Sequence, residues 1–172
     1  MAIVDDLLGI FASSIFAKST ALRSIDLTPN QRRRVRKSIT DDIKACGGIL
    51  YPEVKQVEVS KAAYEAAKLL KIDLGACGWN KQSSFDKGRK VFHWEHVDPV
   101  SCIQEACLKA DSPNQIAAIL KERIRIAWIL KSEDRELTRL EFRSRRPDPR
   151  AAYDAAKIML FEVEQKPKRT ST

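Results

Sequence analysis

The two histidines of the chain lie close together, within residues 91–99, which read VFHWEHVDP. Carboxylates accompany them, because Glu95 directly precedes His96 and Asp98 follows two residues later. A neutral imidazole can take a proton from water, and a carboxylate oxygen is a preferred ligand of hard cations such as Mg²⁺. These side chains are therefore suited to metal-assisted hydrolysis of a phosphodiester, in which a cation polarises the phosphate and stabilises the leaving oxygen.

The residues that precede Pro99 are rich in aromatic and β-branched types, which predicts a strand that ends before this proline. Successive side chains of a strand point to opposite faces. We therefore expect His93 and Glu95 on one face, and His96 with Trp94 on the other. Glu95 and His96 can face a single metal only if the strand twists or bulges near its end.

Further elements have to position these side chains. Two short helical patterns follow, over residues 102–110 and 113–121, and the apolar run 124–130 has the length of a strand. Ser132 is then a suitable N-cap for a helix over residues 133–140. The resulting order is strand, helical insertion, strand and helix.

Residues 95–99, with the sequence EHVDP, resemble the signature of the HNH endonucleases, the ββα-metal nucleases: an acidic residue, a histidine and, further on, a proline. The resemblance covers roughly residues 90–140. It implies that His96 is the general base for water and that Glu95 helps to bind a divalent metal. The implied metal is Mg²⁺, with Mn²⁺ as the alternative.

In that family a helix supplies a further metal ligand, and the resemblance gives this role to Glu133 or, failing it, to Asp134. A middle asparagine orients the catalytic histidine, and Asn114 is the only asparagine between the two expected strands. No histidine follows His96, so the last ligand has to be a carboxylate.

The formal net charge of +8 and the pI near 9.4 produce a positive field that attracts polyanions, of which nucleic acid is the commonest. Two clusters could contact phosphates of DNA, with His93 as a further contact. Their members are Arg32, Arg33, Arg34, Arg36 and Lys37 in one cluster, and Arg143, Arg145 and Arg146 in the other. A solvated basic face is the alternative.

Helical patterns frame these clusters. Residues 2–17 form an apolar helix that suits packing on the domain or on a second subunit, which leaves a homodimer open. Thr28, Pro29 and Gln31 predict a capping box for a helix that runs to about residue 45, where Gly47 and Gly48 end it. A short strand over 54–59 and a helix capped by Ser60 follow, and Asp148 begins a last helix through about Leu160.

Four cysteines without a close pair indicate reduced, mostly buried thiols in a cytoplasmic protein. The apolar run of residues 7–17 is too short to span a bilayer and follows Asp5 and Asp6, so neither export nor membrane insertion is expected. Trp79, Trp94 and Trp128 could stack on bases, but core packing is the expected role of the two in predicted strands, Trp94 and Trp128, and no stacking role is assigned to any of the three.

The sequence thus predicts an α+β fold: a mainly helical single domain, residues 1–164, that encloses a small ββα-metal-like unit. Its parts are a helical segment 1–75, the unit 89–140, a helix 148–161 and a disordered tail 165–172. We expect a metal-dependent HNH-like nuclease acting on DNA. The alternatives are a non-catalytic, basic nucleic-acid-binding or regulatory protein and, less favoured, a protein-interaction module that uses the N-terminal helix. Convergence of Glu95, His96 and Glu133 around one cavity would distinguish the nuclease.

Overall fold

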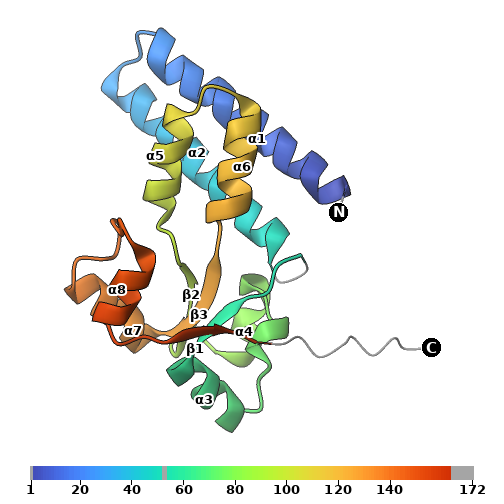
Figure 1. Ribbon diagram of the computed structural model, residues 1–172, viewed down its shortest axis with the longest axis vertical. Coiled ribbons are helices and arrows are strands. Elements are labelled where there is room, and N and C mark those ends of the chain that lie inside the picture. Colours follow the sequence, from blue (N-terminus) through green and yellow to red (C-terminus); the bar gives the residue numbers. More distant parts are fainter. Residues whose placement is uncertain (1, 52–53, 164–172) are drawn as a thin grey trace.

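The computed structural model describes residues 2–51 and 54–163, so the predicted tail 165–172 lies outside the described residues. Four helices pack together at one end of the molecule (Figure 1): α1 (Ala2–Ser24), α2 (Pro29–Leu50), α5 (Val100–Lys109) and α6 (Pro113–Arg123). Their shared core is aliphatic and includes Ala12, Ile15, Ile39, Ile43, Ile103, Ile116 and Leu120. The capping box at the start of α2 is confirmed, because the side chains of Thr28 and Gln31 each accept the other residue's backbone N–H.

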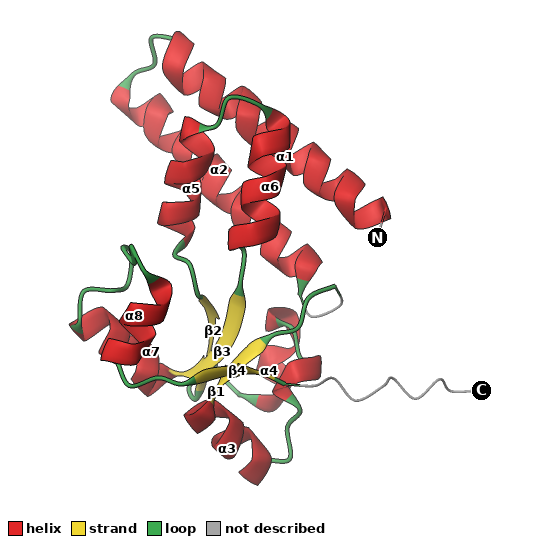
Figure 2. Ribbon diagram, in the orientation of Figure 1, coloured by secondary structure: helices red, strands yellow, loops and turns green. Residues whose placement is uncertain are grey.

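A four-stranded mixed sheet lies below these helices (Figure 2), in the order β2-β3-β1-β4. Strand β2 (Phe92–His96) is an edge strand that runs antiparallel to β3 (Ile126–Leu130). Strand β3 is parallel to β1 (Glu58–Ser60), which pairs antiparallel with β4 (Leu160–Glu162). The mainly helical α+β class predicted from the sequence is confirmed.

The two faces of the sheet pack against different layers. Phe92, Trp94 and Trp128 belong to the larger core, which the four-helix layer shares. Ala127 and Ile129 point the other way, into a smaller core with Leu137 and Tyr153. Those last two residues come from α7 (Lys131–Arg139) and α8 (Pro149–Ala155), which begin after β3 and after a basic loop respectively. Side chains on β2 therefore alternate between two separate environments.

The remaining helices are short. They are α3 (Lys61–Leu69), capped by Ser60 as predicted, the 3₁₀ turns η1 (Leu74–Ala76) and η2 (Trp79–Lys81), and α4 (Gln82–Phe85). The predicted order of strand, helical insertion, strand and helix is present as β2, α5 with α6, β3 and α7.

Helix α2 continues through both glycines that were expected to end it. At Gly47 the helix lies on the sheet: a Cβ there would lie 3.5 Å from Nε2 of His96 and 3.7 Å from Cδ1 of Ile126, both ordinary contacts. Tertiary packing of these last turns, in which Cys46, Gly47 and Leu50 are buried, stabilises the helix beyond the expected end.

The last predicted helix was wrong in its extent, because α8 ends at Ala155 and the chain then forms β4. Lys157 turns the backbone with a φ of 56°, and Leu160 pairs with Ser60. Residues 160–162 therefore form a strand and not the end of a helix, because they pair with β1, a segment distant in the sequence. Strand β1 is also shorter than the predicted 54–59 segment.

Helix α1 is longer than predicted and presents its apolar residues on two sides. Leu8, Ala12 and Ile15 are buried, whereas Ile3 and Ile10 are exposed. Among the described residues, no helix combines the length and the apolar composition needed to cross a membrane.

Candidate functional site

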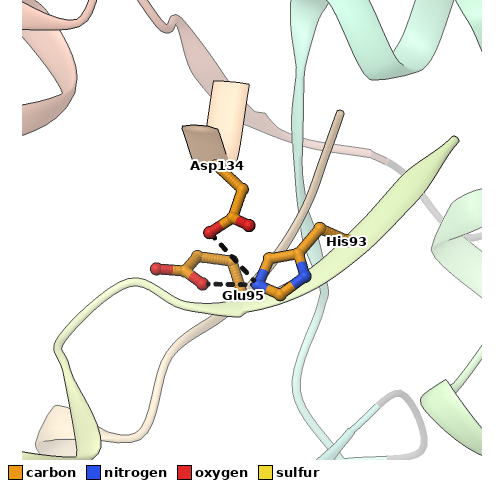
Figure 3. Close-up of side chains that lie close together, drawn as sticks. All are labelled: His93, Glu95 and Asp134. Carbon is orange, nitrogen blue, oxygen red and sulfur yellow. Dashed lines mark hydrogen bonds and ion pairs between the residues drawn. The ribbon is translucent and has the colours of Figure 1, made fainter. Parts of the chain in front are cut away.

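Three side chains that can bind a metal converge beside β2 (Figure 3). Nε2 of His93 lies 3.0 Å from Oε2 of Glu95 and 3.6 Å from Oδ1 of Asp134. One ligand atom from each residue falls within 4.8 Å of the others. His93 and Asp134 remain partly exposed, so the cluster can be reached from solvent.

The pairing of the strands explains this convergence. His93 and Glu95 are two residues apart on β2 and lie opposite Ile129 and Ala127, on the face that α7 covers. Because α7 begins directly after β3, its first turn stands over β2, and this turn carries Asp134. The predicted alternation along the strand thus brings one histidine and one carboxylate together.

Glu133, the preferred helix ligand of the sequence analysis, points elsewhere. Its Oε2 accepts the backbone N–H of Leu130 at 2.7 Å and the hydroxyl of Ser60 at 2.6 Å. The carboxylate thereby caps α7 and ties it to β1. Leu130, and not the predicted Ser132, is the N-cap residue. Successive residues of a helix point about 100° apart, so Asp134 takes the position over β2.

Arg146 holds Glu95 from the side opposite to His93. Its guanidinium binds Oε1 of Glu95 and donates to the carbonyl oxygens of Val97 and Phe142, the latter at 2.7 Å. The prediction that Arg146 contacts phosphate was wrong, because the residue is only 2% exposed. Burial beside a carboxylate gives this arginine a structural role.

The charges around the cluster are balanced. Burial alone would raise the pKa of Glu95, but the hydrogen bond from His93 and the charge of Arg146 hold this pKa below its usual value. Nζ of Lys131 lies 3.1 Å from Nδ1 of His93. An ammonium group can only donate, so Nδ1 is the acceptor and Nε2–H donates to Glu95.

His96 lies on the opposite face of β2, as the alternation predicts, and the structure does not bring it to this cluster. Its Nε2 is buried against α2, beside Gly47, without a hydrogen-bond partner among the described residues. Burial lowers the pKa of His96 to about 4, so the ring is neutral at pH 7. Glu95, His96 and Glu133 therefore do not converge.

A cavity of about 920 Å³ adjoins β2. Its walls come from the second half of α2, residues 78–81, all of β2 beyond Phe92, the start of α5 and residues 143–144. Three cations line it: Lys44, Lys81 and Arg143, all exposed. The edge position of β2 explains why His93 and His96 both line the cavity, although they lie on different faces.

Most of the predicted phosphate contacts lie away from this cavity. The first basic cluster belongs to the start of α2, at the end of the helical layer farthest from the sheet (Figure 1). Within it, Arg32 donates to the carbonyl oxygen of Leu22, and Lys37 binds the carboxylate of Asp41. Arg33 binds Asn30 at 3.1 Å. Arg34, Arg36 and Arg145 are exposed. Of the eight predicted cations, Arg143 is the one that lines the cavity.

Asn114 is exposed in the first turn of α6, at the end of that helix away from the sheet. Eleven helical residues span about 16 Å, and the other end of α6 leads to β3. The structure therefore separates Asn114 from His96, and the predicted orienting contact is absent.

Four residues at the site were not among those predicted from the sequence: Lys44, Trp79, Lys81 and Lys131. Lys131 is the first residue of α7, the helix that carries Asp134, so its proximity to the cluster follows once α7 is known to begin directly after β3. The other three are brought to β2 by long-range packing, for which the local pattern gives no signal.

Comparison of the chain with protein-family models, with curated proteins and with solved structures gives no match.

Proposed function

We propose that the chain is a metal-dependent nuclease that hydrolyses phosphodiester bonds of DNA, with His93, Glu95 and Asp134 as metal ligands. The observation that carries the proposal is the convergence of one imidazole nitrogen and two carboxylate oxygens within 4.8 Å. His93 and Glu95 come from β2, and Asp134 comes from α7, which follows the neighbouring strand β3. The three elements form a strand–strand–helix unit. The cationic cavity next to them supports a phosphate-bearing substrate.

The donor set fits a divalent cation. Oε2 of Glu95 points toward His93, while Arg146 binds Oε1. Residues that hydrogen-bond to a metal ligand commonly fix its orientation in this way. To bind through Nε2, His93 has to carry its proton on Nδ1, which requires Lys131 to turn away. One imidazole among carboxylates favours Mn²⁺ over Mg²⁺.

A bound cation would stabilise the negative charge that develops on the phosphate during hydrolysis. The chain supplies the binding and the orientation. Lys44, Lys81 and Arg143 attract phosphates to the cavity, and Arg146 prevents Glu95 from rotating. The proposal does not use His96 as the base, because Nε2 is buried and a pKa of about 4 makes the ring a poor acceptor near neutral pH.

A second candidate is a nucleic-acid-binding protein without catalysis. The observation in its favour is charge balance, since Lys131 and Arg146 already compensate Glu95 and Asp134. In that case the cluster is an ion-pair network that fastens α7 and the basic loop to the edge strand.

Metal binding and cleavage distinguish the two candidates. We expect Mn²⁺ to bind the purified protein in calorimetry and to support cleavage of DNA, tested on single-stranded and on plasmid substrates, that EDTA abolishes. Asp134→Asn should weaken Mn²⁺ binding and cleavage at least about tenfold, by the loss of one ligand charge. Glu122→Gln is the matched control, because Glu122 is an exposed acid of α6.

Equal Mn²⁺ binding and cleavage by Asp134→Asn and Glu122→Gln would exclude the proposed site. Retarded but uncut DNA, without Mn²⁺ binding, would instead favour the second candidate.

A further inference from the structure

Trp79 is an exposed aromatic residue at the cationic cavity. Its side chain belongs to η2 and lines the cavity, and 47% of the residue is exposed. The guanidinium of Arg89 lies 3.9 Å from the centre of the indole ring. Arg89 covers one face of the ring and is not among the residues that line the cavity.

The backbone fixes this pair in place. Trp128, a fully buried residue, donates its indole N–H to the carbonyl of Cys77 at 3.0 Å, which anchors the segment two residues before Trp79. Gly88 and Arg89 have positive φ values of 75° and 52°. A left-handed conformation is unfavourable for arginine, and here it places the guanidinium on the ring.

The charge of the cavity suits a polyanionic strand. Lys44, Lys81 and Arg143 form no ion pair with a carboxylate of the described residues. Among the described residues that line the cavity, Glu95 is the one with a negative charge, and Arg146 compensates it. The cavity thus combines a half-exposed indole with cations that are available for phosphates.

We infer that this cavity binds an unpaired nucleotide of a single strand, with its base stacked on Trp79 and its phosphates near Lys44, Lys81 and Arg143. A base within a duplex is covered by its neighbours on both faces and cannot stack on a side chain without leaving the helix. A volume of about 920 Å³ is within the range of pockets that enclose a small ligand. The inference rests on the proposed function, because it names the nucleic acid that reaches the His93 cluster.

The test measures binding in EDTA, where cleavage cannot occur. Fluorescence anisotropy compares labelled oligothymidylate, oligouridylate and a duplex of the same length at low salt. We expect the oligothymidylate to bind at least about tenfold more tightly than the duplex, and Trp79→Ala to remove most of this preference. Trp79→Phe keeps a stacking ring and should bind within about threefold of the unchanged protein.

Tyr64→Ala is the matched control, because Tyr64 is another partly exposed aromatic residue, on α3. The binding should quench tryptophan emission in the unchanged protein and less so in Trp79→Phe. Thermal melting and circular dichroism establish that each variant is folded. Tighter binding of oligouridylate than of oligothymidylate would identify the unpaired nucleotide as that of RNA.

Equal binding of Trp79→Ala and Tyr64→Ala, or equal affinity for duplex and single strand, would overturn the inference. These outcomes are separate from the metal experiment. Cleavage that is insensitive to Trp79→Ala leaves the nuclease in place without the stacking site, and Trp79-dependent binding without any cleavage removes the nuclease alone.

Discussion

The two histidines of β2 lie on opposite faces of one strand and have opposite surroundings. His93 is partly exposed, and a carboxylate and an ammonium group contact its two ring nitrogens. Nε2 of His96 is buried against Gly47 of α2 and has no hydrogen-bond partner among the described residues. The residue type is the same, and the packed neighbours differ.

This difference shows what makes one face of the strand suitable for a cation. A buried or partly buried charge is stable when opposite charges and hydrogen bonds compensate it. The His93 face has such compensation from Arg146 and Lys131. The His96 face offers none, so its imidazole stays neutral. Three predictions test this contrast, and the largest expected effect comes first.

Arg146→Met should remove the compensation on the His93 face. Glu95 would then be a buried charge without its cation, and we expect the free energy of unfolding to fall by about 3–5 kcal/mol. Urea denaturation measures the loss. Arg145→Met is the matched control at the neighbouring exposed position and should change stability by no more than about 0.5 kcal/mol.

Replacing Glu95 by Gln in the Arg146→Met protein should recover part of that loss, because the uncompensated charge is then absent. Equal stability of Arg146→Met and Arg145→Met would show that the buried ion pair does not distinguish the two faces.

His96 should make stability depend on pH in a defined window. Its pKa is about 4 in the folded protein and 6.5 without burial, so the unfolded chain binds a proton between these values that the folded protein does not. The stabilisation is complete above pH 6.5 and is lost as the pH falls toward 4. The loss is about 3 kcal/mol.

Urea denaturation at several pH values measures this dependence. His96→Gln cannot take up the proton, so its free energy of unfolding should change less than that of the unchanged protein between pH 6.5 and 4. Glu122→Gln serves again as the control. Parallel pH profiles for the unchanged protein and His96→Gln would contradict a neutral His96 in the folded protein.

The smallest effect concerns the space in front of His96. A Cβ on Gly47 would meet Nε2 of His96 at 3.5 Å, an ordinary contact, and alanine is the better helix former. Gly47→Ala should therefore stabilise the protein by about 0.5–1 kcal/mol. A Cβ on Gly48 would meet nothing within 4 Å, so Gly48→Ala measures the helix effect alone. Thermal melting of both variants gives the difference, and a lower melting temperature for Gly47→Ala would mean that His96 needs the open space.

Local patterns in the sequence predicted the features that neighbouring residues decide. The alternation of His93 and Glu95, the cap at Thr28 and the sequence of strands and helices from β2 to α7 all depend on short-range geometry. Asp134 was named only as a substitute for Glu133, because both lie in one helical turn, and the choice depends on the hydroxyl of Ser60 far along the chain.

The remaining features depend on contacts between distant segments. An arginine in a basic loop is normally exposed, and only the position of Glu95, 51 residues away, buries Arg146. The conversion of residues 160–162 into β4 likewise needs β1 as a partner. Trp79 was assigned no role because the sequence does not show that Arg89 and the cavity both adjoin it.

The edge position of β2 has a consequence for association between molecules. The backbone groups of an unpaired edge are a template on which another chain can add a strand. Here side chains form hydrogen bonds with these backbone groups. The carbonyl of Phe92 accepts from the Gln82 amide, the N–H of Phe92 donates to Asp86, and the carbonyl of His96 accepts from Arg146. Side chains thus block the edge on both sides of Trp94, which protects the strand that carries the candidate site from aggregation through its backbone.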